Sequence, residues 1–248
     1  MIFPQWTLGN IILYGYLVFL VLAIAPMELK GMAMMEYSKF HVSKGLTSRQ
    51  GMLIVYSLPL PALALAGLHY ARAFTLAQLF VFGAIALSFL KRILESLFVH
   101  KYSGTMSIPT IGLIAGLYSL AAYLVGHMAK VTPLPGLDRL FLVGALLYVI
   151  RFISNFAHHK ILADLRKDTL DYVIPSGGLF SMVVCAHYLF EIMIWFGIFL
   201  MARNFAAFLT VAFMIAYLSA RAVRTLRWYR GKFADFPSDR KAIFPFVL

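Results

Sequence analysis

The stretch LGNIILYGYLVFLVLAIAPM, residues 8–27, decides the fold class, because it is apolar, carries no charged side chain and is long enough to span a membrane. A helix needs about 20 residues to cross the hydrocarbon core. Lipid offers the backbone no hydrogen-bond partners, so such a stretch should be helical. Six more stretches of this kind follow at residues 52–70, 74–90, 108–128, 137–156, 179–201 and 205–220. The sequence therefore predicts an all-α membrane protein, a single bundle of seven transmembrane helices.

The composition supports a membrane environment. The chain has 248 residues, of which 62% are hydrophobic and 13% are charged, whereas a soluble domain is about half apolar and about one quarter charged. The formal net charge of +12 would suggest nucleic acid as a partner of a soluble protein. Here the basic residues lie between apolar stretches, so we expect membrane lipids, and no nucleic acid, as partners. The single cysteine, Cys185, excludes an internal disulfide and a multi-cysteine metal site.

The distribution of the 22 Lys and Arg residues predicts an orientation. Most of them lie in the loops 28–50, 91–107 and 157–178 and in the tail from Arg221, which an odd number of spans places on one side. Because cytoplasmic loops carry the excess of basic residues, we expect the C-terminus in the cytoplasm and the N-terminus outside. The membrane would be the inner membrane of a bacterium or the endoplasmic reticulum of a eukaryote.

Prolines predict two local features. Pro59 and Pro61 should kink the second stretch, since proline lacks the backbone N–H that a helix interior needs. Pro133, Pro135 and Gly136 mark a tight connection between the fourth and fifth stretches.

Polar side chains inside the predicted spans are candidates for a functional site. Glu191 lies near the middle of the stretch 179–201, and His187 is one helical turn earlier on the same face. Asn155 and Arg151 form a similar pair in the preceding stretch. Each residue alone is explained equally well by a hydrogen-bond network that only holds helices together. Four of them near the same ends of two adjacent spans favour a polar cavity.

Three arginines, Arg221, Arg224 and Arg227, are spaced by three and form a basic stripe along a helix. One interpretation is an anchor against anionic lipid headgroups. The other is a site for phosphate groups, to which arginine offers several donors in a fixed fork.

His158, His159 and Asp164 are potential metal ligands. Adjacent positions on a helix diverge by about 100°, so the two histidines cannot point at one ion from the same face. We predict no metal site.

The last hundred residues carry the most specific signal. The segment NFAHHKILADLRKDTLDYVIPSGGLFSMVVCAHYLFEIMIWFGI runs from Asn155 to Ile198, and RAVRTLRWYRGKFADFPSDRKAIFPFVL runs from Arg221 to the end. With their L-R-K and Y-x-I-P-x-G-G-L-F motifs, these segments resemble the steroid 5α-reductase superfamily. Upstream, KRILESLFVHKYSGTM at 91–106 resembles the trans-2-enoyl-CoA reductase branch and, less closely, the polyprenol reductase branch. MEYSKF at 35–40 resembles the segment that carries the catalytic Glu of steroid 5α-reductases.

This resemblance implies an NADPH-dependent reductase that acts on a carbon–carbon double bond conjugated to a carbonyl. In such enzymes hydride goes to the β carbon, and an acidic group polarises the carbonyl oxygen. Residues 1–136 would form the substrate side, and residues 137–248 would form the NADPH-binding helices and the cytoplasmic tail. The partner would be a lipophilic enone, with a 3-oxo-Δ4 steroid as the leading expectation.

The resemblance also implies roles for individual residues. Glu36 matches the catalytic acid, with Tyr37 beside it, and by spacing Glu36 would share a helix face with Glu28 if the first helix continued that far. The positions that match substrate contacts are Phe89, Arg92 and Trp195. The positions that match cofactor contacts are Asn155, His159, Arg166, Tyr172, His187, Glu191, Arg221, Arg224 and Tyr229.

Several positions depart from the family pattern. His187 stands where steroid reductases have Asn, His159 where they have Asp, and Thr225 where they have His. Phe89 stands where a catalytic Tyr is expected, and phenylalanine cannot donate a hydrogen bond. Either Glu36 works alone, or another hydroxyl replaces that tyrosine. The two hydroxyls that the sequence suggests for this role are Tyr37 and Tyr102.

Other functions stay open at this level. The same chemistry on a 2-enoyl-CoA would need a second phosphate-binding patch, which the loop 91–101 offers. A polyprenyl substrate is the other variant of that chemistry. A membrane methyltransferase has a related C-terminal architecture, but the IPSGGLF segment and the arginine stripe favour NADPH over S-adenosylmethionine. A transporter or receptor without chemistry is the last class.

Overall fold

A computed structural model describes residues 1–32, 35–40, 44–68, 73–131, 136–167 and 171–248. In this part of the chain the long helices are α1 (Leu8–Leu29), α2 (Ser48–Ser57), α3 (Pro59–Leu68), α4 (Leu76–Leu94), α5 (Ile108–Val131), α6 (Arg139–Asp164), α7 (Ala186–Ala202) and α8 (Phe205–Lys232). The short elements are three helical turns, Ser38–Phe40, Glu95–Val99 and Gly178–Ser181, and the strands β1 (Leu46–Thr47) and β2 (Thr105–Met106).

Six helical stretches in the described ranges are long and apolar enough to cross a membrane: α1, α2 with α3, α4 with its following turn, α5, α6 and α8. The protein is therefore a multi-pass membrane protein, and the prediction of an all-α fold is confirmed. The two two-residue strands are a minor addition to it. The sixth predicted span, 179–201, corresponds to α7, which has only 17 residues and packs along α6. The predicted orientation of the termini stays a prediction.

Helix α7 begins at Ala186, seven residues later than the predicted span at 179. Gly177 and Gly178 take positive φ angles of 90° and 53°, which a helix does not allow. The backbone just before α7 forms hydrogen bonds with the C-terminal tail. The N–H of Val184 donates to the carbonyl of Lys241 at 2.9 Å, and that of Cys185 donates to the carbonyl of Ala242 at 3.0 Å. Pairing with the C-terminal tail thus replaces the first turns of the predicted helix.

The predicted kink in the second span is confirmed as a break at Leu58, between α2 and α3 and directly before Pro59. Pro133 and Pro135 lie outside the described residues, so the predicted tight connection there has no structural outcome. Helix α1 ends at Leu29, and Glu36 therefore does not continue its face.

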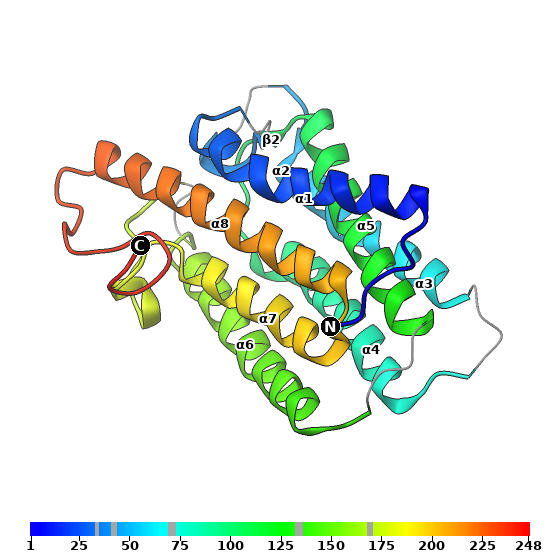
Figure 1. Cartoon of the computed structure of the whole chain (residues 1–248). Helices are drawn as coiled ribbons and strands as arrows, with labels where there is room; N and C mark the ends of the chain where they lie inside the picture. The colour runs from blue at the N-terminus through cyan, green and yellow to red at the C-terminus, as the bar shows by residue number, and fades with distance from the viewer. Residues whose placement is uncertain (33–34, 41–43, 69–72, 132–135, 168–170) are drawn as a thin grey trace.

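The helices pack into one bundle (Figure 1). Helix α1 lies beside α8, and α6 lies beside α7. The α6–α7 contact is close because glycines face each other: a Cβ on Gly144 would come within 2.8 Å of the Gly197 carbonyl oxygen. Strands β1 and β2 pair antiparallel, with Leu46 opposite Met106, and so join the α1–α2 connection to the α4–α5 connection. Both connections reach the cavity described next.

Candidate active site

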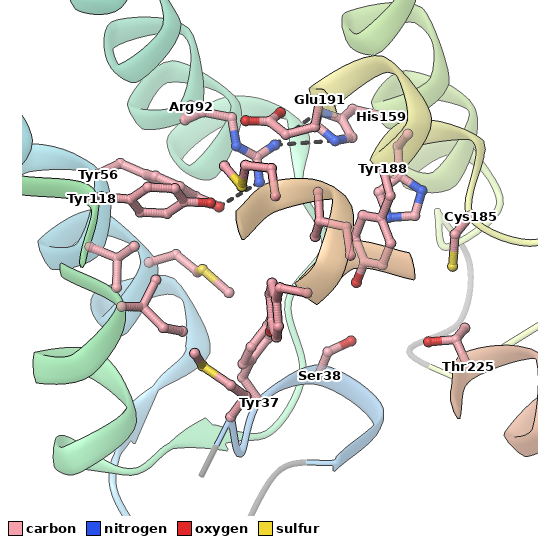
Figure 2. A pocket seen from close by; sticks show the side chains of 18 of the residues that line it. Tyr37, Ser38, Tyr56, Arg92, Tyr118, His159, Cys185, Tyr188, Glu191 and Thr225 are labelled. Carbon is pink, nitrogen blue, oxygen red and sulfur yellow. Dashed lines mark hydrogen bonds between the residues drawn. The ribbon is translucent and has the colours of Figure 1, made fainter. Parts of the chain in front are cut away.

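A cavity of about 300 Å³ lies between α1, α2, α5, α6, α7 and α8 (Figure 2). Helix α8 lines it from Ala206 to Tyr229. At a rise of 1.5 Å per residue, this wall is about 35 Å long. The cavity is therefore elongated and extends along most of α8.

One part of the cavity is apolar. Its walls come from three helices, and the side chains are Leu17, Leu20 and Val21 of α1, Leu117, Leu120 and Leu124 of α5, and Leu209, Phe213 and Met214 of α8. Among these helices' described residues, Thr210 contributes a hydroxyl to this part. This apolar part suits a hydrocarbon ligand.

The other part is polar and basic. Arg166, Tyr172 and Tyr229 line it, together with His187 and Lys39. The Arg166 guanidinium lies 4.8 Å from the centre of the Tyr172 ring and donates to the Ser103 hydroxyl at 2.8 Å. His187 presents a buried Nδ1 for which the described residues provide no hydrogen-bond partner. Such an orphaned atom in a cavity wall is expected where a polar ligand completes the site.

Arg92 and Tyr56 form a hydrogen-bonded pair in the wall (Figure 2). A guanidinium has only donors, so the Tyr56 hydroxyl oxygen accepts from Arg92 Nη2, at 2.5 Å. The hydroxyl proton of Tyr56 is then left to be donated elsewhere. On its other side, Arg92 Nη1 lies 3.0 Å from both Glu95 Oε2 and His159 Nδ1. The buried Glu95 thus fixes the cation that holds the phenol.

Glu191 lines the same wall beside Arg92, and Tyr118 lies next to Tyr56 with ring centroids 6.1 Å apart (Figure 2). The wall therefore combines a carboxylate, a guanidinium and two phenols. This set can donate a proton to a carbonyl oxygen and stabilise negative charge on it.

Glu95, His100 and His159 place one ligand atom each within 4.8 Å of one another, which is the spacing of a metal site. The Arg92 guanidinium already lies among these atoms, 3.4 Å from His100 Nε2. Burial, with Arg92 next to it, lowers the pKa of His100 to about 3, so this ring is neutral. We assign no metal here, because a cation already occupies the position.

The structure brings most of the predicted site residues to the cavity. The ones that line it are Tyr37, Arg92, His159, Arg166, Tyr172, His187, Glu191 and Tyr229. Asn155 lies one layer behind, where it donates to the His187 carbonyl at 2.9 Å and accepts from Lys91. Phe89 and Trp195 also lie in that layer, with the Phe89 ring 5.6 Å from that of Tyr118.

The structure does not place Arg221 and Arg224 at the cavity. Arg221 Nη1 pairs with Glu28 at 2.9 Å, and Arg224 Nη1 pairs with the same carboxylate at 2.7 Å. Glu28 is fully buried and Arg221 is 1% exposed. Arg221 and Arg224 therefore join α8 to the end of α1. Neither the lipid-anchor nor the phosphate-site interpretation of the sequence predicted this structural role.

Glu36 is also outside the cavity. Its side chain is exposed, whereas Met35 before it and the next three residues after it line the cavity. The backbone N–H of Glu36 donates to the Thr110 hydroxyl at 3.2 Å. The structure therefore gives the Glu36 carboxylate no contact with the proposed site of chemistry.

Among the cavity residues that the sequence did not identify are Lys39, Tyr56 and Tyr118. Tyr56 and Tyr118 are single polar groups within apolar stretches, with no partner at helical spacing to mark them. Lys39 belongs to the MEYSKF segment that did predict a place at the site, although the prediction settled on other residues of it.

Comparison with known proteins identifies relatives of this chain. The sequence model of the family described as 3-oxo-5-alpha-steroid 4-dehydrogenase matches residues 134–248. Polyprenal reductase 1 of Oryza sativa subsp. indica is 31% identical over 68% of this chain and 58% of its own length. The very-long-chain enoyl-CoA reductase of Dictyostelium discoideum is 32% identical over 69% of this chain and 59% of its own length.

The 3-oxo-5-alpha-steroid 4-dehydrogenase 1 of Rattus norvegicus is 37% identical, over 44% of this chain and 42% of its own length. The chain thus spans less than two thirds of the length of these curated relatives. The same motif-rich C-terminal half that lines the polar part of the cavity carries the family match. This chain belongs to the steroid 5α-reductase family.

Proposed function

We propose that the protein is an NADPH-dependent reductase of a lipophilic substrate whose carbon–carbon double bond is conjugated to a carbonyl. The observation that carries the proposal is the single cavity that joins a basic, aromatic part to a long apolar part, with Tyr56 and Arg92 in its wall. A dinucleotide fits the first part, and a hydrocarbon fits the second.

The residues of the polar part suit the cofactor. Arg166 offers a charged donor for a phosphate. Tyr172 and Tyr229 offer aromatic surface for a base, and Glu191 offers an acceptor for the N–H groups of a nicotinamide carboxamide. His187 Nδ1 is a further polar atom that a ligand would complete. When bound there, NADPH would supply the hydride that adds to the β carbon of the substrate.

Tyr56 and Arg92 suit the other half of the reaction. Hydride addition turns the conjugated carbonyl into an enolate, whose oxygen carries the new negative charge. The Tyr56 hydroxyl gives its proton to that oxygen, and the Arg92 guanidinium stabilises the phenolate that remains. The enol then becomes the saturated carbonyl compound with hydrogen on the α carbon, and Tyr56 regains a proton from water.

One feature favours an extended chain, such as a polyprenyl enal, over the steroid that the sequence alone favours. The polyprenal reductase 1 and enoyl-CoA reductase named above align with 68% and 69% of this chain, against 44% for the steroid reductase. Similarity to the long-chain enzymes thus extends over more of the chain.

An enoyl-CoA substrate stays the alternative. Its phosphates would need basic groups in the loop 91–101, where Lys91 is buried and pairs with Glu95 at 2.9 Å but Lys101 is exposed and lines the cavity.

The test is NADPH oxidation by the purified protein in lipid nanodiscs, with a polyprenal, a 3-oxo-Δ4 steroid and a trans-2-enoyl-CoA as substrates and with product analysis. We expect turnover with the polyprenal and a saturated product. If only the steroid is turned over, the proposed substrate is wrong and the proposed reaction stands. If S-adenosylmethionine raises the melting temperature and NADPH does not, the reductase proposal fails in favour of a methyltransferase. No thermal shift with either cofactor would favour a protein without this chemistry.

The exposed position of Glu36 leads to a separate prediction. Glu36→Gln should turn over the substrate at the wild-type rate, because its carboxylate does not reach the cavity. The measurement is kcat and KM in the same assay, with a melting curve to verify folding. A loss of about 10²-fold or more in a folded variant would return Glu36 to the role that its family resemblance implies.

A further inference from the structure

The ammonium group of Lys39 lies among aromatic rings in the polar part of the cavity. Its Nζ is 4.7 Å from the centre of the Tyr172 ring, 5.0 Å from Tyr229 and 5.6 Å from Trp228. A cation over the face of such rings within about 6 Å is attracted by them. These rings hold the charge in place, although none of them neutralises it.

The groups around Lys39 have an excess of positive charge. Arg166 and Lys232 both approach the same Tyr172 ring, at 4.8 and 5.8 Å. Within the described ranges no ion pair to a carboxylate is recorded for Lys39. Burial, and the neighbouring Arg221 and Arg166, lower the pKa of Lys39 to about 8. A basic cluster of this kind in a cavity wall is a site for an anion.

The segment that carries Lys39 is fixed by its neighbours. Arg221 donates to the carbonyls of Met35 and Tyr37 at 2.9 and 3.0 Å. The Tyr37 hydroxyl lies 2.8 Å from that of Tyr217, and the Ser38 hydroxyl lies 3.1 Å from that of Tyr172. These contacts fix the backbone and the neighbouring side chains of the segment, so that Lys39 is positioned at the cavity.

We propose that Lys39 binds a phosphate group of the nucleotide cofactor. The proposal rests on the proposed function, since it needs an NADPH site in this cavity. NADPH carries phosphate at two places, the diphosphate bridge and the 2′ position of the adenosine ribose. NADH carries only the diphosphate bridge. Comparison of the two nucleotides therefore identifies which phosphate Lys39 contacts.

The test compares Lys39→Met, Lys39→Arg and wild type by isothermal titration with NADPH and NADH. Lys44→Met is the matched control, because Lys44 is an exposed lysine of the same connection. A charged hydrogen bond is worth about 1.5–3 kcal/mol, so Lys39→Met should raise the Kd of NADPH about tenfold or more. Lys39→Arg should retain most of the affinity, and Lys44→Met should match the wild type.

The outcomes separate cleanly. Weaker binding of NADPH alone assigns Lys39 to the 2′-phosphate, and equal weakening of both nucleotides assigns it to the diphosphate. Unchanged affinity for both in a folded Lys39→Met protein overturns the proposal for Lys39. If the wild type binds neither nucleotide, the proposed function itself fails.

The pH dependence of binding gives a second readout. Lys39 is protonated below about pH 8, so NADPH affinity should be full there and fall as the pH rises further. The charged groups that face it are Arg221, Arg166 and Lys232. Burial raises the pKa of the Cys185 thiol to about 12, which keeps it neutral. The fall above pH 8 should disappear in Lys39→Arg, and its persistence there would contradict the assignment.

Discussion

Replacement of Tyr56 by phenylalanine is expected to reduce kcat by about 10²–10⁴-fold, the usual contribution of a positioned proton donor. The hydroxyl is held by Arg92 and faces the cavity, so its loss removes the proton donor and leaves the ring in place. NADPH affinity should be unchanged, because the phenol belongs to the substrate half of the site. The measurements are kcat, KM and NADPH affinity, with a melting curve for folding.

Tyr118→Phe is the matched comparison for that experiment. Tyr118 lines the same wall next to Tyr56, and no hydrogen bond from Arg92 to it is recorded in the described residues. We expect a smaller loss of kcat than for Tyr56→Phe. If Tyr118→Phe has the larger effect, Tyr118 is the donor, and if neither variant loses turnover, the phenol mechanism is wrong.

Glu28→Gln is expected to lower the free energy of unfolding by about 3–5 kcal/mol, since removal of one partner leaves a buried charge without compensation. Glu28 is fully buried and pairs with Arg221 at 2.9 Å and with Arg224 at 2.7 Å. Both arginines would then face a neutral amide. The measurement is denaturant unfolding in detergent micelles.

The Glu28 variant also has a functional consequence. Arg221 holds the carbonyls of Met35 and Tyr37, so a displaced Arg221 should weaken the hold on Lys39 and reduce NADPH affinity. Asp138→Asn is the control, because Asp138 pairs with Arg203 at the exposed surface, where such a pair contributes little. Equal stability of the two variants would show that the buried pair does not hold α1 against α8.

The apolar stretches of the sequence predicted the helices well, because length and hydropathy alone decide whether a segment can cross lipid. The start of α7 could not be predicted in this way. It depends on the positive φ angles of Gly177 and Gly178 and on pairing of Val184 with Lys241, which lies far along the chain. Local composition contains no information about that pairing.

The site was predicted in part for similar reasons. Spacing by three placed Arg221 and Arg224 on one face, but their partner Glu28 is almost the whole chain away. The MEYSKF resemblance placed the right segment near the cavity. That segment is not a continuous helix, so no periodicity could tell whether Glu36 or Lys39 points inward. Tyr56 carried no signal, since a tyrosine in an apolar span is ordinary.

Helix α8 has a consequence for the construction of chimaeric enzymes. Its first half walls the apolar part of the cavity and its second half walls the polar part. The connection that follows α1 contributes Lys39 to the polar part, although it belongs to the other end of the sequence. A hybrid that joined residues 1–136 of this protein to the C-terminal portion of a relative would therefore exchange pieces of both compartments at once. On the proposed function, we therefore expect substrate range and nucleotide preference to change together in such a hybrid.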